Sequence, residues 1–313
     1  MAKRPQVTVL GSLNMDISVT VPRLPAPGVT VLGSAARFTP GGKGANQAVA
    51  AARLGAGVRM AGCVGDDDFG RRLLAALRAE GVDAGATRVV PGVPTGLAMI
   101  AVDESGENLI VVAPGANHQV SAPDVAAATN GPRDILVISA EIPAPAIAHA
   151  LAETRGARCV LNLAPAPQPQ AAAAALVAAG GAGLDWLVVN ESEAAAVLGR
   201  PVDGLADAAR AAAELVARGP RHAVVTAGAH GAALAGPDGA HAIEGFRVRA
   251  VDTVGAGDTF VGALAVALAA GVPAREAVRA AAAAGAAAVT RHGAQTAMPR
   301  PADILAATGV TWP

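Results

Sequence analysis

Short apolar runs alternate with amphipathic stretches along most of the chain. The runs end at small or polar residues and are typical of strands buried on both faces of a sheet. The amphipathic stretches repeat apolar positions every three or four residues, which predicts helices. Because this alternation is typical of α/β proteins, we expect a mostly parallel central sheet with helices on both faces.

The predicted strands and helices follow one another in a regular order. Strands are expected at Val7–Leu10, Arg59–Val64, Ile135–Ser139, Cys159–Leu163, Trp186–Val189 and His222–Thr226. Helices are expected at Ala45–Leu54, Phe69–Glu80, Ala144–Thr154, Ala171–Ala179, Ala206–Ala217 and Phe260–Ala270. Gly55 and Gly81 directly follow the first two helices, at the position where glycine commonly ends a helix.

Two stretches interrupt this order with pairs of strands that have no helix between them. The pairs are Asp16–Val21 with Ala35–Thr39, and Gly96–Val102 with Asn108–Ala113. We expect them to form a small β-sheet lid over a site that excludes water, and an edge extension of the central sheet is the alternative. The single chain then divides into a main α/β domain, about 1–14, 40–94 and 114–313, and a β lid, about 15–39 and 95–113.

Composition and charge narrow the range of partners. Of the 313 residues, 52% are hydrophobic, and 24 Lys and Arg residues against 25 Asp and Glu residues give a net charge of −1. The chain has 2% aromatic residues and no tyrosine, so it lacks the stacking rings of single-strand binders. It also lacks the basic field that attracts nucleic acid or an anionic membrane. We therefore expect neither as a partner, and an anionic ligand must be held by local groups.

Cysteine spacing and the first residues indicate a reduced, cytoplasmic protein. Cys63 and Cys159 follow no metal-ligand or disulfide spacing, so we expect two buried thiols. Asn14 and Asp16 interrupt the N-terminal apolar stretch too early for a secretory signal. The alanine-rich runs near the C-terminus are shorter than the roughly 20 residues that a membrane helix needs, so we expect soluble helices there.

The strongest chemical signal is the segment VDTVGAGDTF, which ends at Phe260. Gly255, Ala256 and Gly257 precede an expected helix, so their free backbone N–H groups and the positive helix end would form an anion site. Asp258 falls in the first helical turn, where a capping role is the alternative. A carboxylate beside a phosphate is repelled by it, so phosphoryl transfer explains Asp258 better: it would accept the proton of an attacking hydroxyl.

Two further segments offer polar groups to a hydroxylated ligand. GGKGANQ is a glycine-rich turn that enters a helix and carries Lys43 and Asn46, and it fits neither the phosphate-loop pattern nor a dinucleotide fingerprint. GSLNMD ends the first strand, and ligands of open α/β sheets bind beyond the carboxyl ends of strands. Asn14 and Asp16 there supply a donor and acceptors suited to a diol, with an Asx-type turn as the alternative.

In this order, the blocks GSLNMD, GGKGANQA, NESEA, TAGAHG and VDTVGAGDTF resemble the ribokinase family of carbohydrate kinases, over about Val7 to Pro299. The resemblance implies ATP-dependent phosphorylation of D-ribose at its primary 5-hydroxyl, giving ribose 5-phosphate. One alternative is a sister kinase acting on deoxyribose, another sugar or a nucleoside. The other is a catalytically silent regulator that binds sugar or nucleotide.

The resemblance also implies a role for each matching position. The sugar hydroxyls would be held by Asn14, Asp16, Gly42, Lys43, Asn46 and Glu141. The nucleotide would contact Asn190, Thr226, Gly228, Gly231 and Gly257. The amides of Gly255, Ala256 and Gly257 would form the anion hole, and Asp258 would be the base. Glu193 would order Mg²⁺ through water, while Asp252, Val254, Ala288, Arg291 and Gly293 would hold K⁺, mostly through backbone carbonyls.

The chain departs from the family pattern at two positions. Ala297 stands where ribokinases often carry a serine that binds the cation, so only its backbone oxygen is available for K⁺. Ala282 stands where related chains often have His or Asn near the adenine, so contacts there would be apolar. The resemblance further suggests ATP and a pentose as ligands, and a homodimer formed through the lid, because exposed sheet edges invite pairing.

Overall fold

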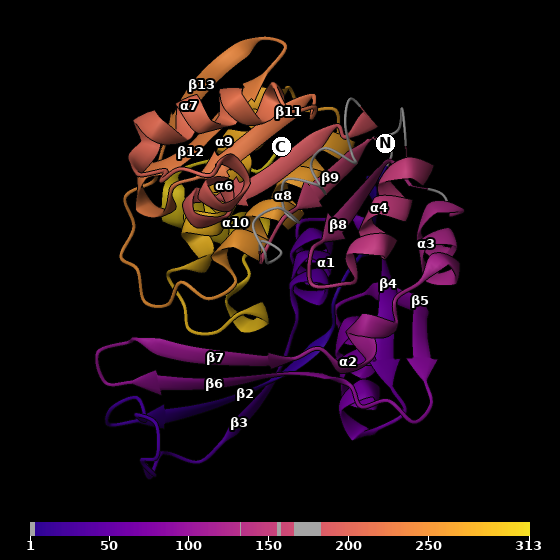
Figure 1. Cartoon of the computed structure of the whole chain (residues 1–313). Helices are drawn as coiled ribbons and strands as arrows, with labels where there is room; N and C mark the ends of the chain where they lie inside the picture. The colour runs from indigo at the N-terminus through magenta and orange to yellow at the C-terminus, as the bar shows by residue number, and fades with distance from the viewer. Residues whose placement is uncertain (1–3, 132, 155–157, 166–182) are drawn as a thin grey trace.

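The chain folds into two sheets, a large one flanked by helices and a small one beside it (Figure 1). This computed structural model describes residues 4–131, 133–154, 158–165 and 183–313. The large sheet has nine strands in the order β13-β12-β11-β10-β9-β8-β1-β4-β5, and the small sheet has four in the order β3-β2-β6-β7. The predicted fold class is confirmed.

All neighbouring strands from β5 to β11 run parallel, whereas β12 and β13 are antiparallel at the edge. Successive side chains of a strand point to opposite sides of the sheet, so a continuous apolar run makes both faces apolar. In β8, for example, Ile135 and Val137 pack in one core and Leu136 and Ile138 in the other. The strands are β1 (Gln6–Leu10), β4 (Gly57–Gly65), β5 (Val82–Val90), β8 (Ile135–Ser139), β9 (Cys159–Asn162), β10 (Trp186–Asn190), β11 (His222–Thr226), β12 (Gly231–Gly236) and β13 (Gly239–Glu244).

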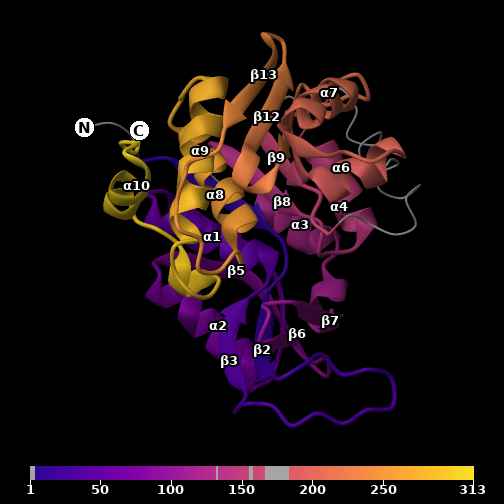
Figure 2. The ribbon, with the colours of Figure 1, turned by 90° about the vertical axis from the view of Figure 1, so that its left-hand side faces the viewer.

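The helices cover the two faces of the large sheet as two separate layers (Figure 2). One layer contains α1 (Lys43–Arg53), α2 (Asp68–Ala79), α8 (Ala256–Ala269) and α9 (Ala274–Ala288), with α10 (Pro301–Thr308) packed on α9. The other contains α3 (Ala122–Thr129), α4 (Ala144–Glu153), α6 (Glu191–Leu198) and α7 (Gly204–Val216). Short 3₁₀ helices lie at η1 (Gly115–Gln119), η3 (Gly228–His230) and η4 (Gln295–Ala297).

The helix predicted at Ala171–Ala179 lies outside the described residues. Within the described ranges, no helix combines the length and the apolar character needed to cross a membrane. Cys63 and Cys159 are free and buried, as the sequence predicts.

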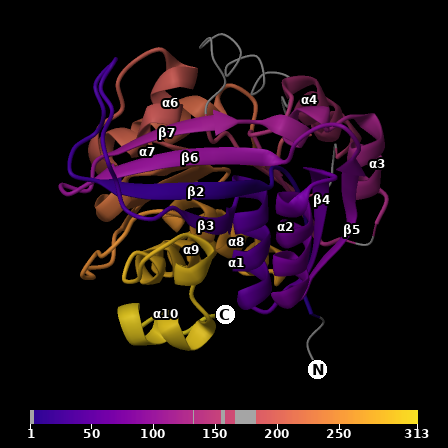
Figure 3. The same cartoon turned by 90° about the horizontal axis from the view of Figure 1, so that it is seen from below.

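The small sheet pairs two hairpin-like units that are far apart in the sequence. It consists of β3 (Arg37–Gly41), β2 (Asn14–Val21), β6 (Gly96–Asp103) and β7 (Asn108–Ala113). The central strands β2 and β6 are parallel, and each has an antiparallel outer neighbour. Figure 3 shows the four strands side by side, separate from the large sheet. The predicted small sheet is confirmed and the edge-extension alternative is wrong, while its boundaries and its role as a lid stay predictions.

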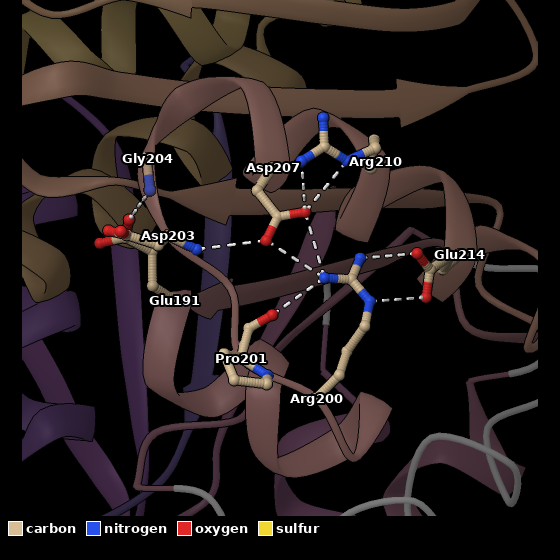
Figure 4. Close-up of polar contacts among 8 residues, drawn as sticks. All are labelled: Glu191, Arg200, Pro201, Asp203, Gly204, Asp207, Arg210 and Glu214. Atoms are coloured by element: carbon tan, nitrogen blue, oxygen red, sulfur yellow. Dashed lines mark hydrogen bonds and ion pairs between the residues drawn. The ribbon is translucent and has the colours of Figure 1, made fainter.

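A network of charged side chains ties α6 to α7 (Figure 4). Arg200 donates to both carboxylate oxygens of Asp207, at 3.1 Å each, and to Glu214 at 2.6 Å. The carboxylate of Glu191 accepts a hydrogen bond from the backbone N–H of Gly204 at 2.8 Å. Because Glu191 directly follows the last residue of β10, these contacts fix the end of that strand relative to both helices.

Candidate active site

A cavity of about 240 Å³ opens at the carboxyl ends of β9, β10 and β11. This is the edge of a parallel sheet where α/β proteins bind their ligands. The start of α1 and the loop before α8 close the cavity from the other side. Seven of the predicted site residues line it: Lys43, Asn190, Glu193, Thr226, Gly255, Gly257 and Asp258.

The N-terminus of α8 presents its backbone to this cavity. Gly255 is the N-cap residue and has φ 76°, a left-handed conformation that favours glycine. A Cβ on Gly257 would meet no atom within 4 Å, so packing alone does not require glycine there. The open space lets a ligand approach the backbone N–H groups of the first turn, as an anion site requires.

Asp258 is buried in the first turn of α8, with a side chain that faces α1. Its Oδ2 accepts a hydrogen bond from Asn46 Nδ2 at 2.8 Å, and its Oδ1 accepts one from Gln47 Nε2 at 3.2 Å. The N-cap of α8 is Gly255, and no side chain caps the helix. A capping role therefore does not explain this aspartate.

Side-chain amides extend from Asp258 in two directions. Asn46 accepts a hydrogen bond from Gln295 Nε2 at 3.1 Å. Gln47 Nε2 also donates to Asn162 Oδ1 at 2.9 Å, and Asn162 Nδ2 donates to the carbonyl oxygen of Val188 at 3.2 Å. Of the four amide side chains, those of Asn46, Gln47, Asn162 and Gln295, only that of Asn46 was assigned a role from the sequence.

The predicted sugar-binding residues gather beside Asp258, and the charged ones among them, Asp16, Lys43 and Glu141, are partly buried. Burial raises the pKa of Asp16 to about 7, and repulsion by Glu141 and Asp258 adds to this effect, while Lys43 opposes it. The pKa of Lys43 is also raised, chiefly by the Asp258 carboxylate; burial lowers it, and Glu141 and Glu193 raise it further. One partly buried lysine thus faces several carboxylates, an arrangement suited to binding hydroxyl groups through both donors and acceptors.

Backbone and side-chain contacts fix the positions of these groups. Gly42 has φ 87°, and a Cβ there would lie 2.6 Å from the backbone nitrogen of Asn14, so glycine lets the start of α1 approach β2. Glu141 accepts hydrogen bonds from Ser12 Oγ at 2.5 Å and from the Lys43 backbone N–H at 3.1 Å. Asn117 Nδ2 donates to Asn14 Oδ1 at 2.7 Å. The sequence interpretation assigned no role to Ser12 or Asn117.

The opposite wall carries the residues predicted for nucleotide and Mg²⁺. Asn190 and Glu193 form a capping box at the start of α6: Glu193 N–H donates to Asn190 Oδ1 at 2.8 Å, and Asn190 N–H donates to Glu193 Oε2 at 2.9 Å. Burial is the main cause that raises the pKa of Glu193 to about 7. Gly228 lies in η3, between β11 and β12, and Gly231 is the first residue of β12; both lie outside the cavity lining.

The residues predicted for K⁺ lie in two adjoining loops and, for Ala288, at the end of α9. Asp252 Oδ1 accepts a hydrogen bond from Val254 N–H at 3.0 Å, and Asp252 Oδ2 accepts one from Gly293 N–H at 2.8 Å. The carbonyl oxygen of Ala288 accepts one from Arg291 N–H at 3.3 Å. In the part of the chain that the structure describes, no group of three or more His, Cys, Asp or Glu residues could hold a metal ion. A metal here would depend on backbone oxygens or on ligand phosphates.

Residues 4–301 match the family model of the pfkB family carbohydrate kinases. The chain belongs to the pfkB family. A curated ribokinase from Haemophilus influenzae is 38% identical over 306 residues, covering 96% of this chain and 98% of that one. The family and the sugar-kinase class predicted from the sequence are confirmed.

Two solved structures extend the comparison of this pfkB family member. The structure of Arabidopsis thaliana ribokinase complexed with ribose and ATP has a TM-score of 0.85 and 30% identity, and covers 97% of this chain and 98% of that one. The structure of phosphofructokinase-2 from Escherichia coli in complex with potassium has a TM-score of 0.77 and 26% identity, with the same coverage of 97% and 98%. The roles of individual residues in this chain stay predictions.

Proposed function

We propose that this pfkB family member transfers the γ-phosphoryl group of ATP to the primary 5-hydroxyl of D-ribose, giving ribose 5-phosphate and ADP. The observation that carries the proposal is the buried carboxylate of Asp258, held beside Lys43 and at the N-terminus of α8 in one cavity. The similarity to ribokinases from Haemophilus influenzae and Arabidopsis thaliana supports ribose as the sugar.

In the proposed mechanism, the 5-hydroxyl oxygen attacks the γ-phosphorus in line as its proton passes to Asp258. The new O–P bond forms as the bond to the β-phosphate oxygen breaks, and ADP leaves with that electron pair. The N–H groups of Gly255, Ala256 and Gly257 stabilise the charge on the transferred phosphoryl oxygens. Asn14, Asp16, Gly42, Lys43, Asn46 and Glu141 orient the sugar, and Asn190, Thr226, Gly228 and Gly231 contact the nucleotide.

We include Mg²⁺ with ATP in the proposal, positioned through water by Glu193. Glu193 fits this role because it is 8% exposed, lines the cavity and uses one carboxylate oxygen for the capping box, which leaves the other for a water molecule. Bound Mg²⁺ neutralises charge on the β- and γ-phosphates. Oxygen ligands and retained water molecules are what this ion prefers.

We also propose K⁺ as an activator, held by Asp252, Val254, Ala288, Arg291 and Gly293. The loops fit such an ion because Asp252 already bridges them, and its two oxygens and the neighbouring carbonyls keep free lone pairs. The related Escherichia coli structure in complex with potassium supports the assignment. Ala297 contributes at most a backbone oxygen, so the expected activation is modest.

A homodimer through the small sheet and a cytoplasmic location complete the proposal. Strand β7 is an edge strand, and its apolar side chains Leu109, Ile110, Val111 and Val112 are 43–53% exposed. A long exposed apolar edge favours pairing with another chain. Met99 on the adjacent strand extends the same apolar surface.

Asp258→Asn tests the mechanism. The substitution preserves shape and leaves one of the two hydrogen bonds from α1 possible, so we expect a folded protein with nearly normal thermal stability and normal binding of ATP and ribose. Loss of the base should lower kcat by at least about 10², with some residual transfer from the α8 amides. Near-wild-type kcat would contradict the assignment of Asp258 as the base.

Release of ADP, measured with D-ribose, 2-deoxyribose, other sugars and nucleosides, tests the substrate. D-ribose should give the highest kcat/KM of the panel. A higher value for another acceptor would favour a sister kinase, and binding of sugar and ATP without turnover would favour a silent regulator.

A further inference from the structure

We propose that Gln47, locked in place by Asn162, is a positioning residue that holds the Asp258 carboxylate away from Lys43 and free to accept the proton of the sugar hydroxyl. This inference rests on the proposed function, in which Asp258 is the base. Gln47 lies on α1, one residue beyond Asn46, and its side chain is fully buried.

The orientation of the Gln47 amide is set by a chain of hydrogen bonds that begins at a backbone carbonyl. Val188 O accepts from Asn162 Nδ2, which leaves Asn162 Oδ1 as an acceptor toward Gln47. The Gln47 NH₂ group therefore points at both Asn162 Oδ1 and Asp258 Oδ1. The flipped amide would place its oxygen against two acceptors, so the network allows only one orientation.

The other end of the same amide has no partner. Gln47 Oε1 is one of two buried side-chain oxygen or nitrogen atoms, among those the structure describes, that make no hydrogen bond. A buried acceptor without a donor is unfavourable for folding, and an apolar side chain of similar size would avoid it. The oxygen therefore does not explain why an amide stands here; the NH₂ group does, because Asn162 sets its orientation and Asp258 accepts its other hydrogen bond.

The contact between Gln47 and Asp258 opposes the electrostatic attraction of Asp258 to Lys43. Asp258 makes the largest contribution to the raised pKa of Lys43, so the two charges attract each other strongly. Yet among the described residues Lys43 and Asp258 form no ion pair. Asn46 and Gln47 hold one carboxylate oxygen each, and together they resist rotation of Asp258 toward the ammonium group. Lone pairs bound to Lys43 would not be available to a hydroxyl proton.

Gln47→Met is the decisive variant because methionine has a similar size and no hydrogen-bonding amide. With MgATP and D-ribose, we expect kcat to fall about tenfold or more, since small errors in the placement of a catalytic group are costly. KM for both substrates should stay within about threefold of wild type. The melting temperature should fall, because Asn162 Oδ1 and Asp258 Oδ1 lose a buried donor, although removal of the unpartnered Gln47 oxygen offsets part of this loss.

Two comparisons test whether Gln47 positions Asp258 or only stabilises the fold. In the Asp258→Asn background, Gln47→Met should lower kcat no further, because residues that act through one another are not additive. The matched control is Thr87→Val, which removes a buried hydrogen bond from Thr87 Oγ1 to Met60 O at 2.9 Å, outside the cavity. This control should lower the melting temperature and leave kcat unchanged.

The inference is overturned if Gln47→Met keeps full kcat, or if its effect persists in the Asp258→Asn background. If Gln47→Met does not fold, Asn162→Ala takes its place: it unlocks the Gln47 amide, and it should lower kcat by several-fold in wild type and not at all beside Asp258→Asn. Absence of ribose-dependent ADP release in the wild-type enzyme would instead refute the proposed function.

Discussion

Gly262 lies on α8 one turn after Asp258, where that helix crosses α1. A Cβ at this position would be 2.7 Å from the Gln47 carbonyl oxygen and 2.8 Å from Ala50 Cβ. We predict that Gly262→Ala lowers both stability and turnover, because the methyl group must push the two helices apart. The same crossing sets the distance between Asn46 and Asp258.

Two opposing terms decide the effect on stability. Alanine in place of glycine within a helix gains about 1 kcal/mol in helix propensity. Overpacking a well-packed core typically costs about 1–3 kcal/mol. The contacts at Gly262 involve rigid backbone on α1, so we expect overpacking to win, with a net loss of about 1–2 kcal/mol.

The effect on turnover follows from the required shift. The 2.7 Å contact must open by about 0.7 Å to reach an ordinary van der Waals distance. An equal movement would stretch the 2.8 Å hydrogen bond from Asn46 to Asp258 to about 3.5 Å, where it no longer holds the carboxylate. Displacements near 1 Å can reduce rates by up to about 10², so we expect kcat to fall about tenfold.

Thermal denaturation and ADP release on the same preparation measure both effects. Gly285→Ala in α9 is the control, because its Cβ would lie 3.3 Å from the nearest atom, the Ala256 carbonyl oxygen. We expect its stability to be close to that of wild type or higher. A Gly262→Ala protein with wild-type melting temperature and kcat would refute the role given to this crossing.

Two further predictions concern ions and pH. Replacing K⁺ by Na⁺ or a large organic cation should lower kcat, and Asp252→Ala should abolish that response; equal rates in all three cations would count against the site. The unliganded protein should lose stability from about pH 4 to pH 7, because folded Asp16 and Glu193 keep their protons up to a pKa of about 7, whereas unfolded carboxyls release theirs near 3.8 and 4.5. Stability from these groups is thus present at low pH and lost as pH rises through about 7, and melting curves of Asp16→Asn should show a smaller loss.

The alternation of elements could be predicted because most strands of the large sheet are buried on both faces. Ile135–Ser139 and His222–Thr226 match β8 and β11 residue for residue. Strand β5 was missed because it lies at the edge, where its exposed positions interrupt the apolar run. Strand β12, with the sequence GAALAG, was missed because it contains no β-branched or aromatic residue.

Residues of the candidate site could be predicted only where several of them stand close together in one short segment of the sequence. Gln47 lay within a recognised block, but its partners Asn162 and Asp258 are 115 and 211 positions away in the sequence. The local pattern of residues carries no information on hydrogen bonds between residues so far apart in the sequence. Asn162 did leave a signal that was overlooked, since it is a polar residue at the carboxyl end of a buried parallel strand.

The small sheet has a consequence for the order in which the molecule folds. Its central strands pair Asn14 with Gly96, and the chain between them builds β3, α1, β4, α2 and β5. Closing so long a loop costs entropy that the two strands alone recover poorly, so their pairing waits for the large sheet to bring them together. The small sheet is therefore the last part to form and the first to open, and its amide hydrogens should exchange with solvent while those of β8 and β9 remain protected.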